Sequence, residues 1–141
     1  MHPTTDFKVA IIGGGIGGLT CALSLAKQCP GIKIDVYEQA AQYKEIGAGV
    51  GIGVNAAKIL HQLGVGKAAN AISGRRSGIH RSLRRWDNGE EIVTTDASFD
   101  QEEIRQLSVH RAELLDILLK AIRERGVATL HNKKRSVKVT V

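Results

Sequence analysis

The sequence predicts an α/β fold in which strand–helix–strand units build a parallel sheet. A short apolar run at residues 8–12 is followed by glycines and then by a segment with helical periodicity at 16–28. A second strand-like run follows at 32–37. The 141 residues match the size of one domain, and a hydrophobic content of 43% is typical of a globular chain.

The first strand–helix–strand unit is expected to span residues 8–38. Its first run is continuously apolar, which predicts a strand buried on both faces. The apolar stripe of the helix consists of Leu19, Ala22, Leu23 and Ala26. Pro30 and Gly31 end that helix, and the second strand closes at Glu38. A crossover of this kind between parallel strands is nearly always right-handed.

A second helix and a hairpin are expected in the middle of the chain. Asn55 is a candidate N-cap and Gly64 a candidate terminator for the helix. Its expected stripe consists of Ala56, Ile59, Leu60 and Leu63. Two strand-like runs, 79–86 and 91–95, flank the turn sequence Asp87-Asn88-Gly89, which predicts a β-hairpin inserted into the α/β fold.

The last third predicts a long helix followed by strands. Ser108 is a candidate cap for a helix over 109–125, which Gly126 would end. The stripe of this helix consists of Leu114, Ile117, Leu118, Ala121 and Ile122. Residues 127–130 then predict a third strand of the sheet. A further strand is predicted from the alternation of Val137, Val139 and Val141, where the pattern stops, so we expect an incomplete fold.

The glycines between the first strand and the first helix form the motif Gly13-x-Gly15-x-x-Gly18. In this position the first glycine permits a tight turn, the second lets backbone approach a pyrophosphate, and the third lets the helix pack near the sheet. An acid, Glu38, stands at the end of the second strand, where a carboxylate accepts hydrogen bonds from a ribose. These features together predict a Rossmann-like dinucleotide site, and the acid disfavours NADP there. The alternative is a glycine-rich turn with a surface glutamate.

Three further segments carry a resemblance to a known family. They are residues 45–56 (EIGAGVGIGVNA), 84–89 (RRWDNG) and 108–115 (SVHRAELL). Together with the glycine motif, and in the same order, they resemble the N-terminal FAD-binding part of salicylate-hydroxylase-like flavoprotein aromatic monooxygenases, the group A FAD-dependent family. Val54 departs from the proline common in the family before Asn55.

The resemblance implies a set of FAD-binding residues. The glycine turn with Ile16 and Gly17 would cradle the pyrophosphate, and Glu38 with Gln39 would hold the adenosine ribose. Arg111 would hold FAD through its guanidinium, although a surface salt bridge with Glu103 or Glu113 is the alternative. The complete set implied is Gly13, Gly15, Ile16, Gly17, Gly18, Glu38, Gln39, Ala48, Gly49, Val50, Gly51, Arg111 and Leu130, with 48–51 beside the ribityl chain and flavin edge and 130 by the adenine. It leaves the catalytic residues unidentified: His110 is a candidate, and the alternative, which we favour, is a plain helix-start residue.

The resemblance also implies an activity. Members of the family use NAD(P)H to reduce FAD, and a flavin hydroperoxide then hydroxylates a small aromatic, typically phenolic, substrate with O2. Their downstream Gly-Asp motif and substrate domain are absent from the 141 residues, so residues 1–141 are expected to form the N-terminal portion of the FAD-binding domain, incompetent for turnover alone. The alternative is a non-catalytic nucleotide-binding module or truncated gene product. The glycine-rich stretch after residue 45 disfavours an NAD-dependent dehydrogenase.

Composition excludes several other classes. The net charge of +6 comes from separated basic pairs and the run 133–135, which we interpret as solvated surface without nucleic-acid binding. No stretch approaches the roughly 20 apolar residues of a membrane span, and no signal peptide is evident. Cys21 and Cys29 are expected to be free thiols in a reducing, cytoplasmic compartment, and the five histidines lack metal-ligand spacing. The oligomeric state is not predicted.

Overall fold

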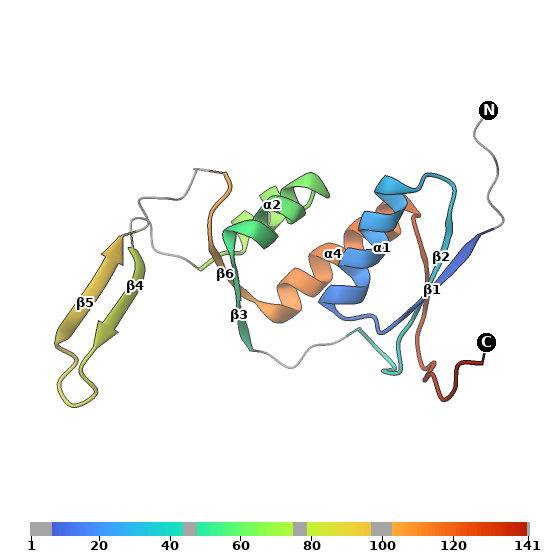
Figure 1. Ribbon diagram of the computed structural model, residues 1–141. Coiled ribbons are helices and arrows are strands. Elements are labelled where there is room, and N and C mark those ends of the chain that lie inside the picture. Colours follow the sequence, from blue (N-terminus) through green and yellow to red (C-terminus); the bar gives the residue numbers. More distant parts are fainter. Residues whose placement is uncertain (1–6, 44–47, 75–78, 97–102, 141) are drawn as a thin grey trace.

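A computed structural model describes residues 7–43, 48–74, 79–96 and 103–140 (Figure 1). Its elements, in chain order, are β1 (Lys8–Ile12), α1 (Ile16–Gln28), β2 (Lys33–Tyr37), β3 (Gly49–Ile52), α2 (Val54–Gln62), α3 (Gly66–Ala71), β4 (Ile79–Arg84), β5 (Glu91–Asp96), β6 (Leu107–His110), α4 (Arg111–Arg125) and β7 (Thr129–His131). The three-stranded sheet lies at one end, the β4–β5 hairpin at the other, and α1, α2 and α4 between them (Figure 1).

The main sheet is parallel, with strand order β1-β2-β7. One face of β2 presents Ile34 and Val36, which are 4% and 0% exposed, to α1, which in turn packs on α4. The core continues into these helices through Leu19 of α1 and Leu114, Leu118 and Ile122 of α4, all fully buried. The predicted α/β class with a parallel sheet is confirmed, and α1 has the predicted bounds.

The prediction that the first strand is buried on both faces is wrong. β1 lies at the edge of the sheet, and its residues alternate between half-buried and exposed, with Ile12 59% exposed. Helix α1 packs on the face that carries Ile11, so the side chains of Ala10 and Ile12 on the opposite face stay exposed. An apolar run therefore marks the strand correctly without fixing how many layers cover it.

Helix α2 begins and packs differently from the prediction. Its N-cap residue is Gly53, and Asn55 lies inside the first turn without a capping hydrogen bond. Its buried residues are Ala57 and Leu60, whereas Ile59 is 46% exposed. Leu63, just after the helix, is 6% exposed, so the predicted burial of Leu60 and Leu63 is confirmed and the error is confined to Ile59.

The prediction that Ser108 caps the long helix is also wrong. Residues 107–110 form β6, which pairs antiparallel with β3, and His110 is the N-cap of α4. Leu107 and Val109 are buried while Ser108 and His110 are exposed, the alternation of a half-buried strand. The end of α4 follows the prediction, because Gly126 adopts a left-handed φ of 60° there.

The predicted hairpin is confirmed and the predicted last strand is not. β4 and β5 pair antiparallel around a turn in which Gly89 has φ 75°, and Trp86 beside it is 97% exposed. Residues 132–140, which the structure describes, form no strand, and Val137 and Val139 are 90% and 77% exposed. Val141 lies outside the described residues. The start of this segment is instead hydrogen-bonded to the segment after β2, through the N–H groups of Lys133 and Lys134.

The described part of the chain contains no helix long and apolar enough to cross a membrane. Within the same residues no three potential metal ligands among the His, Cys, Asp and Glu side chains gather into a binding group. Cys21 and Cys29 are free thiols, as predicted.

Candidate functional site

The turn between β1 and α1 is built around two glycines with different constraints. Gly13 has a φ of +103°, which side chains rarely tolerate, and its N–H donates to the Tyr37 carbonyl at 2.8 Å. Gly18 is constrained by space, since a Cβ there would lie 1.9 Å from the Gly13 carbonyl oxygen. By contrast, a Cβ on Gly17 would meet nothing within 4 Å. The turn and the approach of α1 to the sheet therefore require the first and third glycines of the motif.

The backbone amides that open α1 are available to a ligand. The first N–H group with an acceptor inside the helix is that of Leu19, which donates to the Gly15 carbonyl at 3.0 Å. The four preceding N–H groups, from Gly15 to Gly18, consequently have no intrahelical acceptor. The first turn carries no acidic residue, and the helix dipole adds about half a positive charge at this end. Such an arrangement suits an anion.

The side chain of Glu38 is hydrogen-bonded to the same turn. It follows β2, and its Oε2 accepts the Gly14 N–H while its Oε1 accepts the Ala40 N–H, each at 2.8 Å. These bonds hold the pKa of the Glu38 carboxyl below its ordinary value: the Ala40 amide lowers it most, then Gly14, against the opposing effect of partial burial. The carboxylate is therefore ionised at neutral pH. A carboxylate has about four acceptor positions, so two remain for a ligand.

This pKa shift predicts a pH dependence of stability. Because the folded-state pKa of Glu38 is depressed, its contribution is present above the unfolded-state pKa and is lost as pH falls through the folded-state pKa. In urea unfolding, wild type should exceed Glu38→Gln in unfolding free energy at about pH 7, and the gap should shrink below about pH 4. A gap of the same size at both pH values would contradict the assignment of the shift to these bonds.

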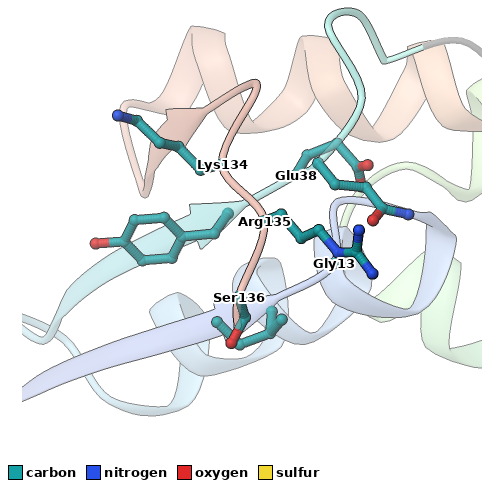
Figure 2. A pocket seen from close by; sticks show the side chains of 8 residues that line it. Gly13, Glu38, Lys134, Arg135 and Ser136 are labelled. Carbon is teal, nitrogen blue, oxygen red and sulfur yellow. The ribbon is translucent and has the colours of Figure 1, made fainter. Parts of the chain in front are cut away.

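A cavity of about 240 Å³ lies beside the turn. It is lined by Ile12, Gly13, Tyr37, Glu38, Gln39, Lys134, Arg135 and Ser136 (Figure 2). The structure thus brings three of the predicted residues, Gly13, Glu38 and Gln39, into one pocket. Sequence reasoning missed residues 134–136, of which Lys134 and Arg135 belong to the basic run interpreted as solvated surface. The signal that could have found them is the parallel pairing of β2 with β7, which sends both following segments to one sheet edge.

Sequence reasoning also missed Tyr43. A Cβ on Gly14 would lie 2.2 Å from its ring, so the tyrosine packs over the turn. Burial, with the nearby Glu38 carboxylate second, raises the pKa of the Tyr43 hydroxyl. Tyr43 also lines a small cavity of about 100 Å³ together with Gly14, Gly15 and Leu115 of α4. The first part of α4 therefore lies close to the glycine turn.

The predicted residues of segment 48–51 and Arg111 form a separate group on β3 and the start of α4, next to β6. The Arg111 N–H donates to the Ala48 carbonyl at 3.0 Å, and β3 and β6 line a cavity of about 390 Å³. Added Cβ atoms on Gly49 and Gly51 would meet nothing, so packing of the described residues does not demand glycine there. Leu130 of β7 pairs with Val36 and packs against the core. It lines neither of these cavities.

Comparison with known proteins assigns a class to this arrangement. Residues 11–43 match the family described as NAD(P)-binding Rossmann-like domain. The chain is 35% identical to 3-amino-4-hydroxybenzoate 2-monooxygenase PtmB3 of Streptomyces platensis, over 95% of this chain and 35% of that protein. It is also 35% identical to a salicylate hydroxylase of Pseudomonas putida, over 94% of this chain and 29% of that protein. The chain spans about a third of the length of these curated relatives.

Solved structures agree in fold. A variant of HpxO from Klebsiella pneumoniae, complexed with FAD, superposes with a TM-score of 0.72 at 30% identity, covering 92% of this chain and 32% of that one. PqsL from P. aeruginosa superposes with a TM-score of 0.74 at 21% identity, covering 95% of this chain and 35% of that one, a likeness of fold alone. The sequence similarity and the fold thus both extend over nearly the whole chain.

Proposed function

We propose that this chain, which is similar over nearly its whole length to the N-terminal FAD-binding part of salicylate-hydroxylase-like flavoprotein monooxygenases, binds the FAD of such an enzyme. The observation that carries the proposal is the fastening of Glu38 to the glycine turn, where its Oε2 accepts the Gly14 N–H at 2.8 Å. That bond places an ionised carboxylate beside unpaired helix-opening amides, a combination suited to a ribose joined to a diphosphate.

The described residues fit this cofactor. Glycine at position 18 lets α1 approach the Gly13 carbonyl closely, and the amides from Gly15 to Gly17 would donate to the diphosphate. The free acceptor positions of Glu38 would receive the ribose hydroxyls, with Gln39 beside them. The segment 48–51 and Arg111 would hold the flavin side, because the Ala48–Arg111 backbone bond keeps them together. The backbone of Leu130 would lie toward the adenine.

We further propose that the complete enzyme hydroxylates a small aromatic molecule with O2 and NAD(P)H. When bound, FAD supplies the redox chemistry of that reaction. The residues of this chain would bind and orient the cofactor through the backbone amides, Glu38 and Arg111. Similarity to enzymes named for hydroxybenzoate and salicylate supports an aromatic acid as the substrate class.

Equilibrium binding tests the proposal. A few charged hydrogen bonds contribute about 1.5–3 kcal/mol each before ordering costs, so FAD and ADP should bind the 141-residue chain with dissociation constants of about 10–1,000 µM. Riboflavin, which lacks diphosphate and adenosine, should bind far more weakly. The same chain should show no NADPH oxidation above background. Failure of both FAD and ADP to bind at millimolar concentration would overturn the proposal, and turnover of an aromatic acid would contradict the limited role given to these residues.

A further inference from the structure

The cavity beside the glycine turn has an asymmetric distribution of charge. The carboxylate of Glu38 lies on one wall, and the backbone of residues 134–136 crosses the other. Figure 2 shows the Arg135 side chain running toward Gly13 and Glu38, whereas the Lys134 side chain points away from them. Arg135 therefore presents its guanidinium to the turn at which the proposed diphosphate would lie.

Backbone hydrogen bonds of neighbouring residues hold Arg135 beside the pocket, and none of them involves its side chain. The Glu38 N–H donates to the His131 carbonyl at 2.8 Å, and the Lys134 N–H donates back to the Glu38 carbonyl at 2.9 Å. The Lys133 N–H donates to the Ala40 carbonyl at 3.1 Å. These bonds fasten the segment that follows β7 to the segment that follows β2, and Arg135 is the next residue along. The backbone at Arg135 is therefore largely ordered before a ligand binds.

Within the described part of the chain, the guanidinium has no ion-pair partner. Among the residues that the structure describes, Arg135 makes no ion pair, and both oxygens of Glu38 are engaged by backbone amides instead. The opening turn of α1, from Ile16 to Leu19, carries no charged side chain. A diphosphate bound there would face the negative charge of Glu38, and among the described residues that line the pocket only Lys134 and Arg135 carry a positive charge. Of these two, Arg135 is the one whose side chain is directed at the turn (Figure 2).

We infer that Arg135 is a phosphate-binding residue of this site, contacting the diphosphate of the adenine dinucleotide across the pocket from Glu38. A planar guanidinium can donate two parallel hydrogen bonds to phosphate oxygens, which a lysine cannot match. A phosphate on the ribose 2′ oxygen would offer the same chemistry beside Glu38. The diphosphate is favoured because Figure 2 shows the side chain directed at the Gly13 turn. The inference rests on the proposed dinucleotide site.

Calorimetric titration of wild type, Arg135→Gln, Arg135→Lys and Lys133→Gln with ADP and with adenosine 2′,5′-bisphosphate tests the inference. Lys133→Gln is the matched control, because it removes the same charge two residues away at a side chain that does not line the pocket. Arg135→Gln should weaken ADP binding about fivefold and flatten its salt dependence, Arg135→Lys should recover part of the loss, and Lys133→Gln should change affinity by less than about 1.5-fold.

The outcomes separate the inference from the function on which it rests. Equal ADP affinities of Arg135→Gln and Lys133→Gln would overturn it, since the effect would then be one of overall charge or absent. A loss confined to the 2′,5′-bisphosphate would overturn the assignment to the diphosphate. Wild-type protein that binds neither ADP nor FAD would instead count against the proposed dinucleotide site itself.

Discussion

Replacing Gly18 with alanine should lower the free energy of unfolding by about 2 kcal/mol and abolish detectable ADP binding. The added Cβ would lie 1.9 Å from the Gly13 carbonyl oxygen and 3.3 Å from the Ile11 side chain. The carbonyl belongs to the turn itself, so relief requires moving either the turn or the whole of α1. Either movement displaces the amides that are proposed to receive the diphosphate.

Gly17→Ala is the matched control for that substitution. It makes the same chemical change one residue earlier in the same helical turn, at a position where the new Cβ meets nothing within 4 Å. Alanine favours a helix over glycine by up to about 1 kcal/mol, so this variant should be as stable as wild type or more so. Urea unfolding followed by circular dichroism compares the two. If both variants unfold at the same urea concentration, the close approach at Gly18 does not constrain the fold.

Replacing Glu38 with arginine should weaken FAD and ADP binding at least several-fold. The substitution removes the acceptors of the Gly14 and Ala40 amides, and with them the bond that fastens the tip of β2 to the turn. It also removes the acceptor proposed for the ribose hydroxyls and puts a donor in its place. Loss of this acceptor should outweigh any attraction between the new guanidinium and the diphosphate, because the hydroxyls would then face a group that cannot accept from them.

Glu124→Arg controls for the change of two charge units. Glu124 is 65% exposed on α4 and pairs with Lys120 on the surface, outside the pocket beside the turn. Fluorescence titration with FAD should give wild-type affinity for this variant and reduced affinity for Glu38→Arg, with thermal unfolding run in parallel to show that both are folded. Unchanged affinity of a folded Glu38→Arg protein would refute the ribose role of Glu38.

Much of the fold could be predicted because its signals are local. The glycine turn, the stripe through Leu19 and Leu23, and the break at Pro30 are sufficient to define β1, α1 and the start of β2. Asn88 and Gly89 mark the hairpin turn, and Gly126 marks the end of α4. In each case a single residue or a period specifies the backbone without reference to distant parts of the chain.

The wrong predictions concern segments whose structure depends on contacts with residues that are distant in the sequence. Leu107-Ser108-Val109-His110 satisfies both a capped helix start and a strand, and only pairing with β3 selects the strand. Ile59 fits a helical stripe, yet the side of α2 that carries Ala57 and Leu60 is the one buried. Arg135 could not be placed beside Glu38, nearly a hundred residues away, without knowing that β7 pairs with β2. The pocket depends on sheet order, which the periodicity of a segment does not encode.

A crystal structure of the chain grown with ADP measures most directly whether the β1–α1 turn is a diphosphate site. The account predicts diphosphate oxygens within hydrogen-bond distance of the amides from Gly15 to Gly17, and ribose hydroxyls on the Glu38 carboxylate. ADP bound elsewhere on the protein, with those amides contacting only solvent or a side chain, would contradict it.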